Sequence, residues 1–494
     1  MLKDHRGILN QRRAGILLHP TSLPGGTLGM EAYHFIDRLA ACGITLWQML
    51  PLGPTHADGS PYQCLSAHAG SPALIDLELL REEGWLGAHA ASLEEAFDGF
   101  LARAQPRMRQ AFAAFMEEQA FWLEDYAVFI ALREEHGGRA WFEWPKPLRA
   151  REPGALREAR VRLHARIDRV RFEQFVFFHQ WQRLKDYARH RGVLLFGDVP
   201  IYVAHDSAEV WTRPDLFTVD ELGRAEEVAG VPPDYFSATG QRWGNPLYRW
   251  ERHVVDGFAW WKARFATQLK LFDLVRMDHF RGLEAYWAIP ADCETAIDGR
   301  WIKAPGDALL TALHEYFGHL PVVAEDLGMI TDEVVALRQR HGLPGMRILQ
   351  FAFDGNPNNP YLPHNHTHDS VVYTGTHDND TTLGWWSGLD DETRTRVLDY
   401  LGHIPEPMPW PLIRAALESV ANLVILPLQD VLELGSEARM NTPGTTEGNW
   451  RWRFAWEQWD EARSERLRRE VEMYGRGHGM ESDSSWGGEA PSPR

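Results

Sequence analysis

Residues 193–199 read V-L-L-F-G-D-V, a short run of apolar and β-branched residues. The run follows an amphipathic stretch in which Phe172, Val176 and Leu184 recur at nearly helical spacing, and which Gly192 ends. A buried strand next to an amphipathic helix is the unit from which parallel sheets are built. This segment therefore indicates an α/β protein.

Runs of the same kind alternate with amphipathic stretches along the whole chain. We predict eight strands, near residues 14–18, 44–50, 193–199, 271–277, 321–324, 346–351, 371–375 and 421–426. Eight strands joined by helices favour a closed (β/α)8 TIM barrel. A doubly wound open sheet is the alternative, because counting strands in one sequence leaves both arrangements open.

Two connections are too long for ordinary strand-to-helix loops, namely 53–170 and 200–258, which follow the second and third strands. In a barrel they would rise from the C-terminal rim and form the walls of a groove. We predict one domain over 1–473 that contains both insertions. Residues 474–494 are rich in Gly and Ser, and we expect a disordered tail there.

Charge and composition limit the partners of this chain. Its formal net charge is −18, which disfavours nucleic acid, because nucleic-acid binding begins with neutralising phosphates. The 21 Trp suit a neutral sugar, although most of them are expected in the core. No run reaches the ~20 apolar residues of a membrane span. Three Cys and the lack of an apolar stretch after the N-terminus predict a cytoplasmic protein.

Acidic residues stand where four of the predicted strands end. They are Asp198 in F-G-D-V-P, Asp278 in V-R-M-D-H-F-R-G, Glu325 in V-A-E-D-L-G and Asp378 in T-G-T-H-D-N-D. Each alone could be an ordinary helix N-cap. Together they would crowd one rim of a barrel, at a cost in repulsion and desolvation that points to a function.

A pair of carboxyl groups that flanks a glycosidic bond is the minimum equipment for cleaving it. We take Asp278 as the nucleophile, because Arg276 and His279 should depress its pKa. We take Glu325 as the proton donor, because the apolar P-V-V-A before it should raise its pKa.

These motifs resemble the catalytic triad of the amylomaltases, 4-α-glucanotransferases related to the α-amylases. The resemblance extends over about residues 13–450 and includes S-P-Y-Q from Ser60, the long block 228–248 and G-S-E-A-R-M-N from Gly435. It implies that Asp278 is the nucleophile and Glu325 the general acid/base. Asp378 would hold the sugar hydroxyls as the ring distorts.

The resemblance also implies sugar contacts. Arg276, His279 and His377 would line the donor site with Asp198 nearby, and Tyr62 would stack on a sugar at the acceptor side. A loop with Tyr235 and Phe236 would arch over the groove, and Trp243, Asn245 and Asn449 would be further contacts. Cys64 and His68 depart from the family pattern, which bears on acceptor preference.

A retaining mechanism follows, in which the two carboxyl groups lie ~5 to 5.5 Å apart. The partners would be an α-1,4-glucan donor and a glucose or maltooligosaccharide acceptor, with no metal and no cofactor. An α-glucan hydrolase, or a non-catalytic glucan-binding protein, would use the same groove. T-H-D-N-D could instead hold the metal of a nucleotide-sugar transferase, and His364, His366 and His368 could bind Zn.

Overall fold

The protein is built on a closed barrel of eight parallel strands. The computed structural model describes residues 7–233 and 237–477. Around the barrel the order is β1-β12-β11-β10-β9-β6-β3-β2, and β1 pairs with both β2 and β12, which closes the ring. The strands are β1 (Arg13–Leu17), β2 (Leu46–Gln48), β3 (Leu194–Val199), β6 (Leu274–Met277), β9 (Val322–Ala324), β10 (Gly345–Ile348), β11 (Ser370–Tyr373) and β12 (Leu423–Pro427). All eight predicted strands and the closure are confirmed, and the open sheet is wrong.

Side chains fill the barrel interior, so the barrel is a packed core and not a pore. Leu46, Phe196, Leu274 and Val323 belong to one buried cluster contributed by successive strands. Gly15 on β1 has no room for a side chain, since a Cβ there would stand 2.7 Å from Leu46 Cβ on β2. A side chain at that position would push β1 away from β2.

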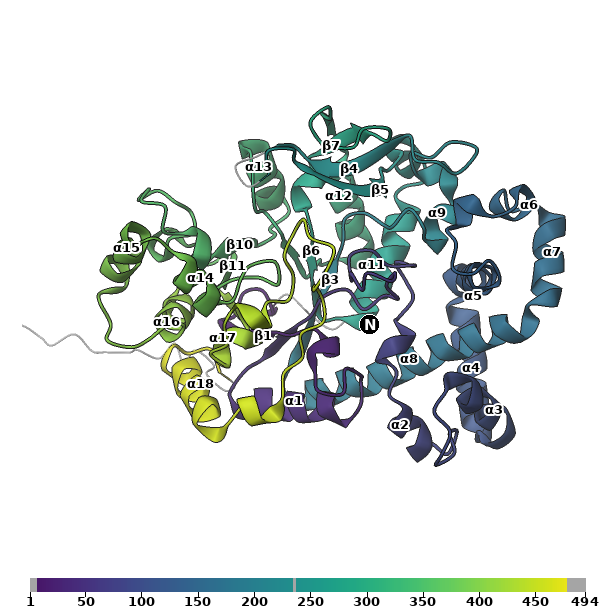
Figure 1. Ribbon diagram of the computed structural model, residues 1–494, viewed down its shortest axis with the longest axis horizontal. Coiled ribbons are helices and arrows are strands. Elements are labelled where there is room, and N and C mark those ends of the chain that lie inside the picture. Colours follow the sequence, from purple (N-terminus) through teal and green to yellow (C-terminus); the bar gives the residue numbers. More distant parts are fainter. Residues whose placement is uncertain (1–6, 234–236, 478–494) are drawn as a thin grey trace, which may run out of the picture.

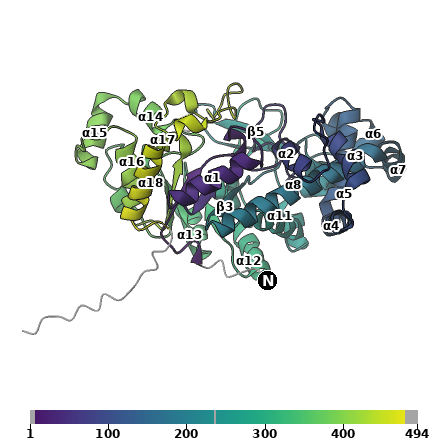
Figure 2. The ribbon, with the colours of Figure 1, turned by 90° about the horizontal axis from the view of Figure 1, so that it is seen from below.

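Helices cover the outside of the barrel, as Figure 2 shows from below. The longest, α8, replaces the shorter helix expected before Gly192. The covering helices are α1 (Met30–Ala41), α8 (His164–His190), α11 (Ala259–Leu271), α12 (Gly306–Phe317), α13 (Asp332–Arg340), α14 (Thr382–Gly388), α15 (Asp391–Leu401), α16 (Trp410–Glu418), α17 (Leu428–Val431) and α18 (Glu461–Met473). Short 3-10 turns are η2 (Pro20–Ser22), η3 (Pro72–Leu74), η4 (Trp141–Glu143), η5 (Pro214–Leu216), η6 (Phe280–Leu283), η7 (Leu349–Phe351), η8 (Pro363–Asn365), η9 (Ser436–Ala438) and η10 (Trp456–Gln458).

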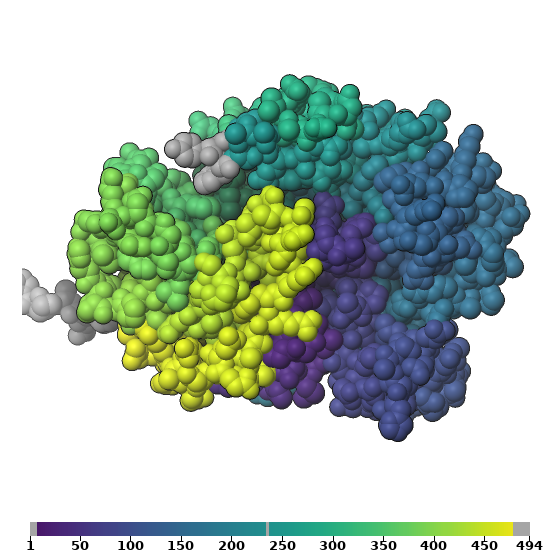
Figure 3. All heavy atoms as spheres, in the orientation of Figure 1, coloured from purple at the N-terminus to yellow at the C-terminus, as the bar shows by residue number. Residues whose placement is uncertain are grey.

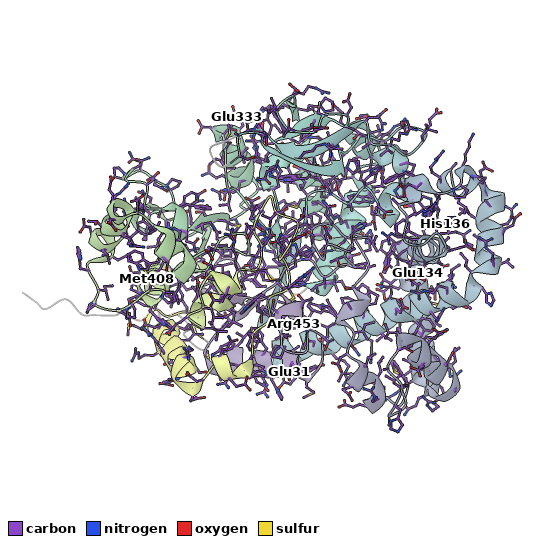
Figure 4. All side chains as sticks on the ribbon, in the orientation of Figure 1. Glu31, Glu134, His136, Glu333, Met408 and Arg453 are labelled. Atoms are coloured by element: carbon purple, nitrogen blue, oxygen red, sulfur yellow. The ribbon has the colours of Figure 1, made fainter. Side chains whose placement is uncertain are left out.

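The connection from β2 to β3 forms a helical lobe at one end of the molecule (Figure 1). Ion pairs fasten it to α8, for instance Arg166 Nε to Glu134 Oε2 at 2.6 Å. Figure 4 labels Glu134 and His136 in this lobe, on the side opposite Met408. Its helices are α2 (Leu77–Glu82), α3 (Leu93–Arg103), α4 (Pro106–Glu118), α5 (Ala120–Glu135), α6 (Lys146–Arg149) and α7 (Pro153–Arg162).

The connection after β3 contributes to a second sheet that the sequence analysis did not predict. It supplies α9 (Ala208–Thr212), β4 (Glu227–Val231), β5 (Gln241–Pro246) and α10 (Trp250–Val255). β7 (Ala285–Pro290) and β8 (Arg300–Lys303) follow barrel strand β6 and pair with them antiparallel, in the order β5-β4-β7-β8. Two separate connections therefore build one sheet beside the rim.

The C-terminal segment packs closely up to residue 477. The Arg476 side chain is fully buried and donates to the backbone oxygens of Leu417, Ser419, Ala421 and Asn422. Residues 474–477, which the sequence analysis assigned to a disordered tail, are thus held in place by the buried Arg476 side chain. Residues 478–494 lie outside the described part. Within the described ranges, no helix combines the length and apolarity needed to cross a bilayer.

Candidate active site

The four carboxylates singled out by the sequence lie at one rim of the barrel. Asp198 is the last but one residue of β3, and Asp278 directly follows β6. Glu325 directly follows β9, and Asp378 lies in the loop after β11. Since the strands are parallel, these carboxyl ends face the same way. The predicted convergence on the C-terminal rim is confirmed.

Arg276 is the cation at the centre of the site. Its side chain is almost fully buried, and its guanidinium lies 2.9 Å from Asp198 Oδ2 and 2.7 Å from Asp278 Oδ1. Its position on β6 points it into the rim two residues before Asp278. Arg276 therefore fixes the orientation of the Asp278 carboxylate and offsets part of the acidic charge around it.

Glu325 is tied to the backbone that carries Asp278. Its Oε2 accepts from the backbone N–H of His279 at 2.7 Å, and its Oε1 accepts from that of Leu327 at 2.9 Å. The Glu325 N–H in turn donates to the Met277 oxygen at 3.0 Å. The two candidate catalytic residues thus belong to one hydrogen-bonded unit across β6 and β9.

Burial raises the pKa of Asp278 to about 8, although Arg276 opposes that effect, and Asp198 and Glu325 add to it through like charge. The sequence analysis expected the opposite direction, and this expectation is wrong, because burial outweighs the neighbouring cation. Burial also raises the pKa of Glu325, again against Arg276. Both shifts have the same direction and the same main cause, which is burial of the carboxyl group.

Tyr62 lies among the residues predicted for the donor sugar. Its hydroxyl donates to Asp198 Oδ2 at 2.7 Å, accepts from Arg276 Nη2 at 3.1 Å and lies 2.9 Å from His377 Nε2. Its ring stacks on that of His377, with the ring centroids 5.3 Å apart. This arrangement differs from the acceptor-side position that the family resemblance implies for Tyr62.

His279 and Trp243 form one wall of the site. The His279 backbone is left-handed, with φ of 49°, and the Trp243 ring meets the His279 ring edge-on at 4.8 Å. Burial lowers the pKa of His279 to about 3, so its imidazole is neutral. His279 Nε2 has no hydrogen-bond partner within the described part of the chain, which leaves it able to bond a sugar hydroxyl.

Asp378 is the most open of the four carboxylates, with its side chain 48% exposed. Asn441 Nδ2 donates to its Oδ1 at 2.6 Å, and His377 Nε2 lies 3.3 Å from the same oxygen. Arg439 Nη2 donates to its backbone oxygen at 2.7 Å. The sequence analysis missed Asn441 and Arg439, although both lie in the G-S-E-A-R-M-N motif quoted there.

Two predicted sugar contacts are engaged within the protein. Asn245 is 5% exposed, and its Nδ2 donates to the Val203 oxygen at 2.9 Å. Its Oδ1 accepts from Gln63 Nε2 at 3.1 Å, and Gln63 Oε1 accepts in return at 3.4 Å. Asn449 Oδ1 accepts from the Thr442 N–H at 2.9 Å and so orders the loop that carries Asn441. Tyr235 and Phe236 lie outside the described residues.

Two of the three alternating histidines that suggested a zinc site, His364 and His366, have their ring nitrogens near other protein oxygens. His366 Nδ1 lies 2.8 Å from Ser419 Oγ, and its Nε2 lies 2.9 Å from the Tyr361 oxygen. Both nitrogens of His364 also lie within hydrogen-bonding distance of protein oxygens. In the described ranges no three His, Cys, Asp or Glu side chains are grouped so as to hold a metal ion.

The C-terminal part of the chain, which includes Asn441, packs against N-terminal residues. Figure 3 shows the C-terminal residues in yellow next to N-terminal residues in purple, and Phe454 N–H donates to the Ser22 oxygen at 3.0 Å. A barrel that gathers paired carboxylates and a buried arginine at its C-terminal rim defines the class of enzymes that act on glycosidic bonds.

The comparisons with known proteins agree with this class. The model of glycoside hydrolase family 77, described as 4-alpha-glucanotransferase, matches residues 18–458. The chain is 52% identical over 473 residues to the 4-alpha-glucanotransferase of Thermus thermophilus, covering 90% of this chain and 95% of that protein. It is 42% identical to the chloroplastic/amyloplastic 4-alpha-glucanotransferase of Solanum tuberosum, covering 94% and 87%. The solved amylomaltase of Streptococcus agalactiae in complex with acarbose is 38% identical, with a TM-score of 0.91 over 94% of this chain and all of that one.

The chain belongs to the 4-alpha-glucanotransferase family, whose members are amylomaltases and other enzymes of that activity. The family predicted from the sequence motifs is thereby confirmed, and so is the transferase class of the enzyme.

Proposed function

We propose that this enzyme transfers a segment of an α-1,4-glucan to the 4-hydroxyl of glucose or of a maltooligosaccharide, through a covalent intermediate on Asp278. The observation that carries the proposal is the hydrogen-bonded unit of Asp278 and Glu325, joined through His279 and faced by Arg276. Attack and proton transfer must act on the same linkage, and adjacent strand ends suit that requirement.

In the first step a carboxylate oxygen of Asp278 attacks C1 of the donor sugar. The bond from C1 to the bridging oxygen breaks, and Glu325 gives its proton to that oxygen as the leaving glucan departs. The pair carries one negative charge before and after this step, because the charge passes from Asp278 to Glu325. The two backbone N–H groups on Glu325 stabilise it in its charged form.

In the second step the acceptor 4-hydroxyl gives its proton to Glu325, and its oxygen bonds to C1. The ester bond to Asp278 breaks, and the Asp278 carboxylate is restored. Water can take the place of the acceptor, which would give hydrolysis. A transferase favours the sugar by holding it in the attacking geometry, which can supply a large effective molarity.

Donor-site roles are proposed for the residues around this pair. Tyr62, Asp198, Arg276, His279 and His377 would bind the donor sugar, and Asp378 would hold its hydroxyls with support from Asn441. Trp243 would contact the sugar on the far side of the bond that breaks, because it lies against His279. For Tyr62 we propose the donor side, since its hydroxyl bonds to Asp198 and Arg276.

Incubation of the enzyme with maltotriose alone tests the function. A transferase yields glucose together with oligomers longer than maltotriose, whereas a hydrolase yields only shorter products and new reducing ends. Tight binding of glucan without any change in its length would instead favour a non-catalytic protein.

We also propose that the enzyme works in the cytoplasm. Cys42, Cys64 and Cys293 are all free thiols, which suits a reducing compartment. Fractionation of the source cells, followed by an assay of each fraction with maltotriose, would test this location.

A further inference from the structure

Trp301 stands apart from the other tryptophans of the protein. It is 38% exposed, and no other tryptophan in residues 7–233 and 237–477 is classed as exposed. It lies on β8, at the edge of the second sheet, opposite Trp287 on β7. An exposed aromatic ring that adjoins other exposed apolar side chains can mark a ligand-binding surface.

The Trp301 ring is held rigidly. The Arg281 guanidinium lies 3.8 Å from its ring centroid, and Arg281 is itself 6% exposed and donates to the Met329 backbone oxygen. The Trp287 ring meets Trp301 at 5.2 Å and 67°, and Trp287 Nε1 is fixed by the Ala296 oxygen at 2.9 Å. A ring fixed in this way loses little conformational freedom when a ligand stacks on it.

Arg281, which lies against the Trp301 ring, connects this ring to the two loops that follow the catalytic pair. Arg281 is three residues beyond Asp278, and Met329 is four residues beyond Glu325. At most ~11 Å of extended chain separates Asp278 from Arg281. Figure 4 labels Glu333 at the start of α13, just after this loop and beside the sheet. Because Arg281 also contacts Trp301, a glucan that extends from the catalytic pair on this side would run toward the Trp301 ring.

The surroundings of Trp301 suit a neutral ligand with apolar faces. The charges of β8 are paired, Arg300 with Glu227 and Lys303 with Glu284. Met329 is 58% exposed and Ile297, next to Ala296, is 52% exposed. An anionic or cationic partner would find no unpaired charge on this strand, whereas the CH face of a glucose unit finds a flat aromatic surface.

We propose that Trp301 is the stacking platform of a distal site that binds the α-glucan chain beyond the catalytic groove, on the side of Glu325. This inference rests on the proposed function, and it adds a dependence on chain length. Long glucans reach the platform and short ones do not, so Trp301 favours long substrates over short ones.

The test compares kcat/KM for maltoheptaose with kcat/KM for maltotriose. We expect Trp301→Ala to lower the ratio of the two about fivefold, since an aromatic stacking contact is worth about 1 kcal/mol. Tyr316→Ala is the matched control, because Tyr316 on α12 is 62% exposed and also has a cation, Lys262, over its ring. The ratio for this control should stay at the wild-type value.

A second measurement needs no change at Trp301. In the Asp278→Asn variant, which cannot turn over, hydrogen exchange of residues 296–303 should slow with maltoheptaose and not with maltotriose. An unchanged ratio in Trp301→Ala, or equal exchange with both sugars, would overturn the distal site while leaving the proposed function intact. If the wild-type enzyme transfers nothing from either sugar, the proposed function itself fails.

Discussion

The backbone N–H of His279 donates a hydrogen bond of 2.7 Å to Oε2 of Glu325. The residue that follows Asp278 thus holds the carboxyl group that is proposed to protonate the leaving sugar. The left-handed conformation of His279 aims this N–H at Glu325 and costs backbone energy, of order 1 kcal/mol for a non-glycine residue. Strain of this kind persists where the surrounding structure fixes the geometry of a site.

Variants of Asp278 and of Glu325 are expected to respond differently to a donor whose leaving group needs no proton. Asp278→Asn and Glu325→Gln should each lower maltotriose disproportionation by about 10⁴-fold or more, because the first step loses its nucleophile in one variant and its acid in the other. With a glucosyl fluoride donor, whose leaving group needs no proton, Glu325→Gln should recover much of its cleavage rate and Asp278→Asn should not. Asp391→Asn, an exposed carboxylate on α15, serves as the control.

Recovery of Asp278→Asn by the fluoride donor would contradict the role of Asp278 as nucleophile. Equal failure of both variants with that donor would contradict the role of Glu325 as acid.

Activity should follow a bell-shaped dependence on pH. The active pair holds one proton, so activity falls at low pH when Asp278 also becomes protonated, and at high pH when Glu325 loses the shared proton. Burial raises the pKa of Asp278 to about 8 and raises that of Glu325, so we expect both limbs of kcat/KM at a higher pH than that at which ordinary carboxyl groups titrate. The measurement is kcat/KM for maltotriose from pH 4 to 10. An alkaline limb near pH 4 to 5 would contradict the raised pKa values.

Removing the hydroxyl of Tyr62 should impair bond cleavage itself. Tyr62→Phe keeps the ring but loses the bonds to Asp198, Arg276 and His377, so we expect cleavage and transfer to fall together by about tenfold. Tyr62→Ala should lower both rates further, because it also removes the ring. Steady-state rates of glucose release and of oligomer formation measure the two processes. A loss of transfer without a loss of cleavage in Tyr62→Phe would contradict the donor-side role and would favour a role of Tyr62 in binding the acceptor.

The amide pair of Gln63 and Asn245 ties two walls of the groove together. Gln63 adjoins Tyr62, and Asn245 lies two residues from Trp243 on β5. Breaking the pair should let the walls separate and admit water, so Gln63→Ala should raise the hydrolysed share of maltotriose several-fold relative to the transferred share. Gln182→Ala on the exposed face of α8 is the control.

A double-mutant cycle tests whether the two amides act as a pair. If they do, Asn245→Ala should add little to the change already made by Gln63→Ala. If the change in the hydrolysed share of the double variant equals the sum of the changes in the two single variants, each residue acts independently.

Sequence alone was sufficient for the eight barrel strands, because their residues are mostly apolar and buried. It was also sufficient for the converging carboxylates, because residues after parallel strands must meet at one rim. The second sheet was missed because its strands come from two segments on either side of β6. Gly230 within β4 and Gly240 just before β5 also interrupt the sequence pattern there.

The remaining differences depend on distances and burial that no local pattern contains. The place of Tyr62 follows from contacts with Asp198 and His377, which lie 136 and 315 residues away in sequence. The pKa of Asp278 follows from its burial, which neighbours in sequence do not reveal. Arg276 was correctly recognised as its partner, but its effect on the pKa of Asp278 is outweighed by that burial.

The sheet of β5, β4, β7 and β8 draws its strands from segments on either side of barrel strand β6. If the 200–258 region of a relative replaced that of this protein, its β4 and β5 would have to form one sheet with the native β7 and β8. The transplanted β4 would meet a foreign β7 along its whole edge, so the two regions have to be exchanged together, as a single cassette that also includes Trp301.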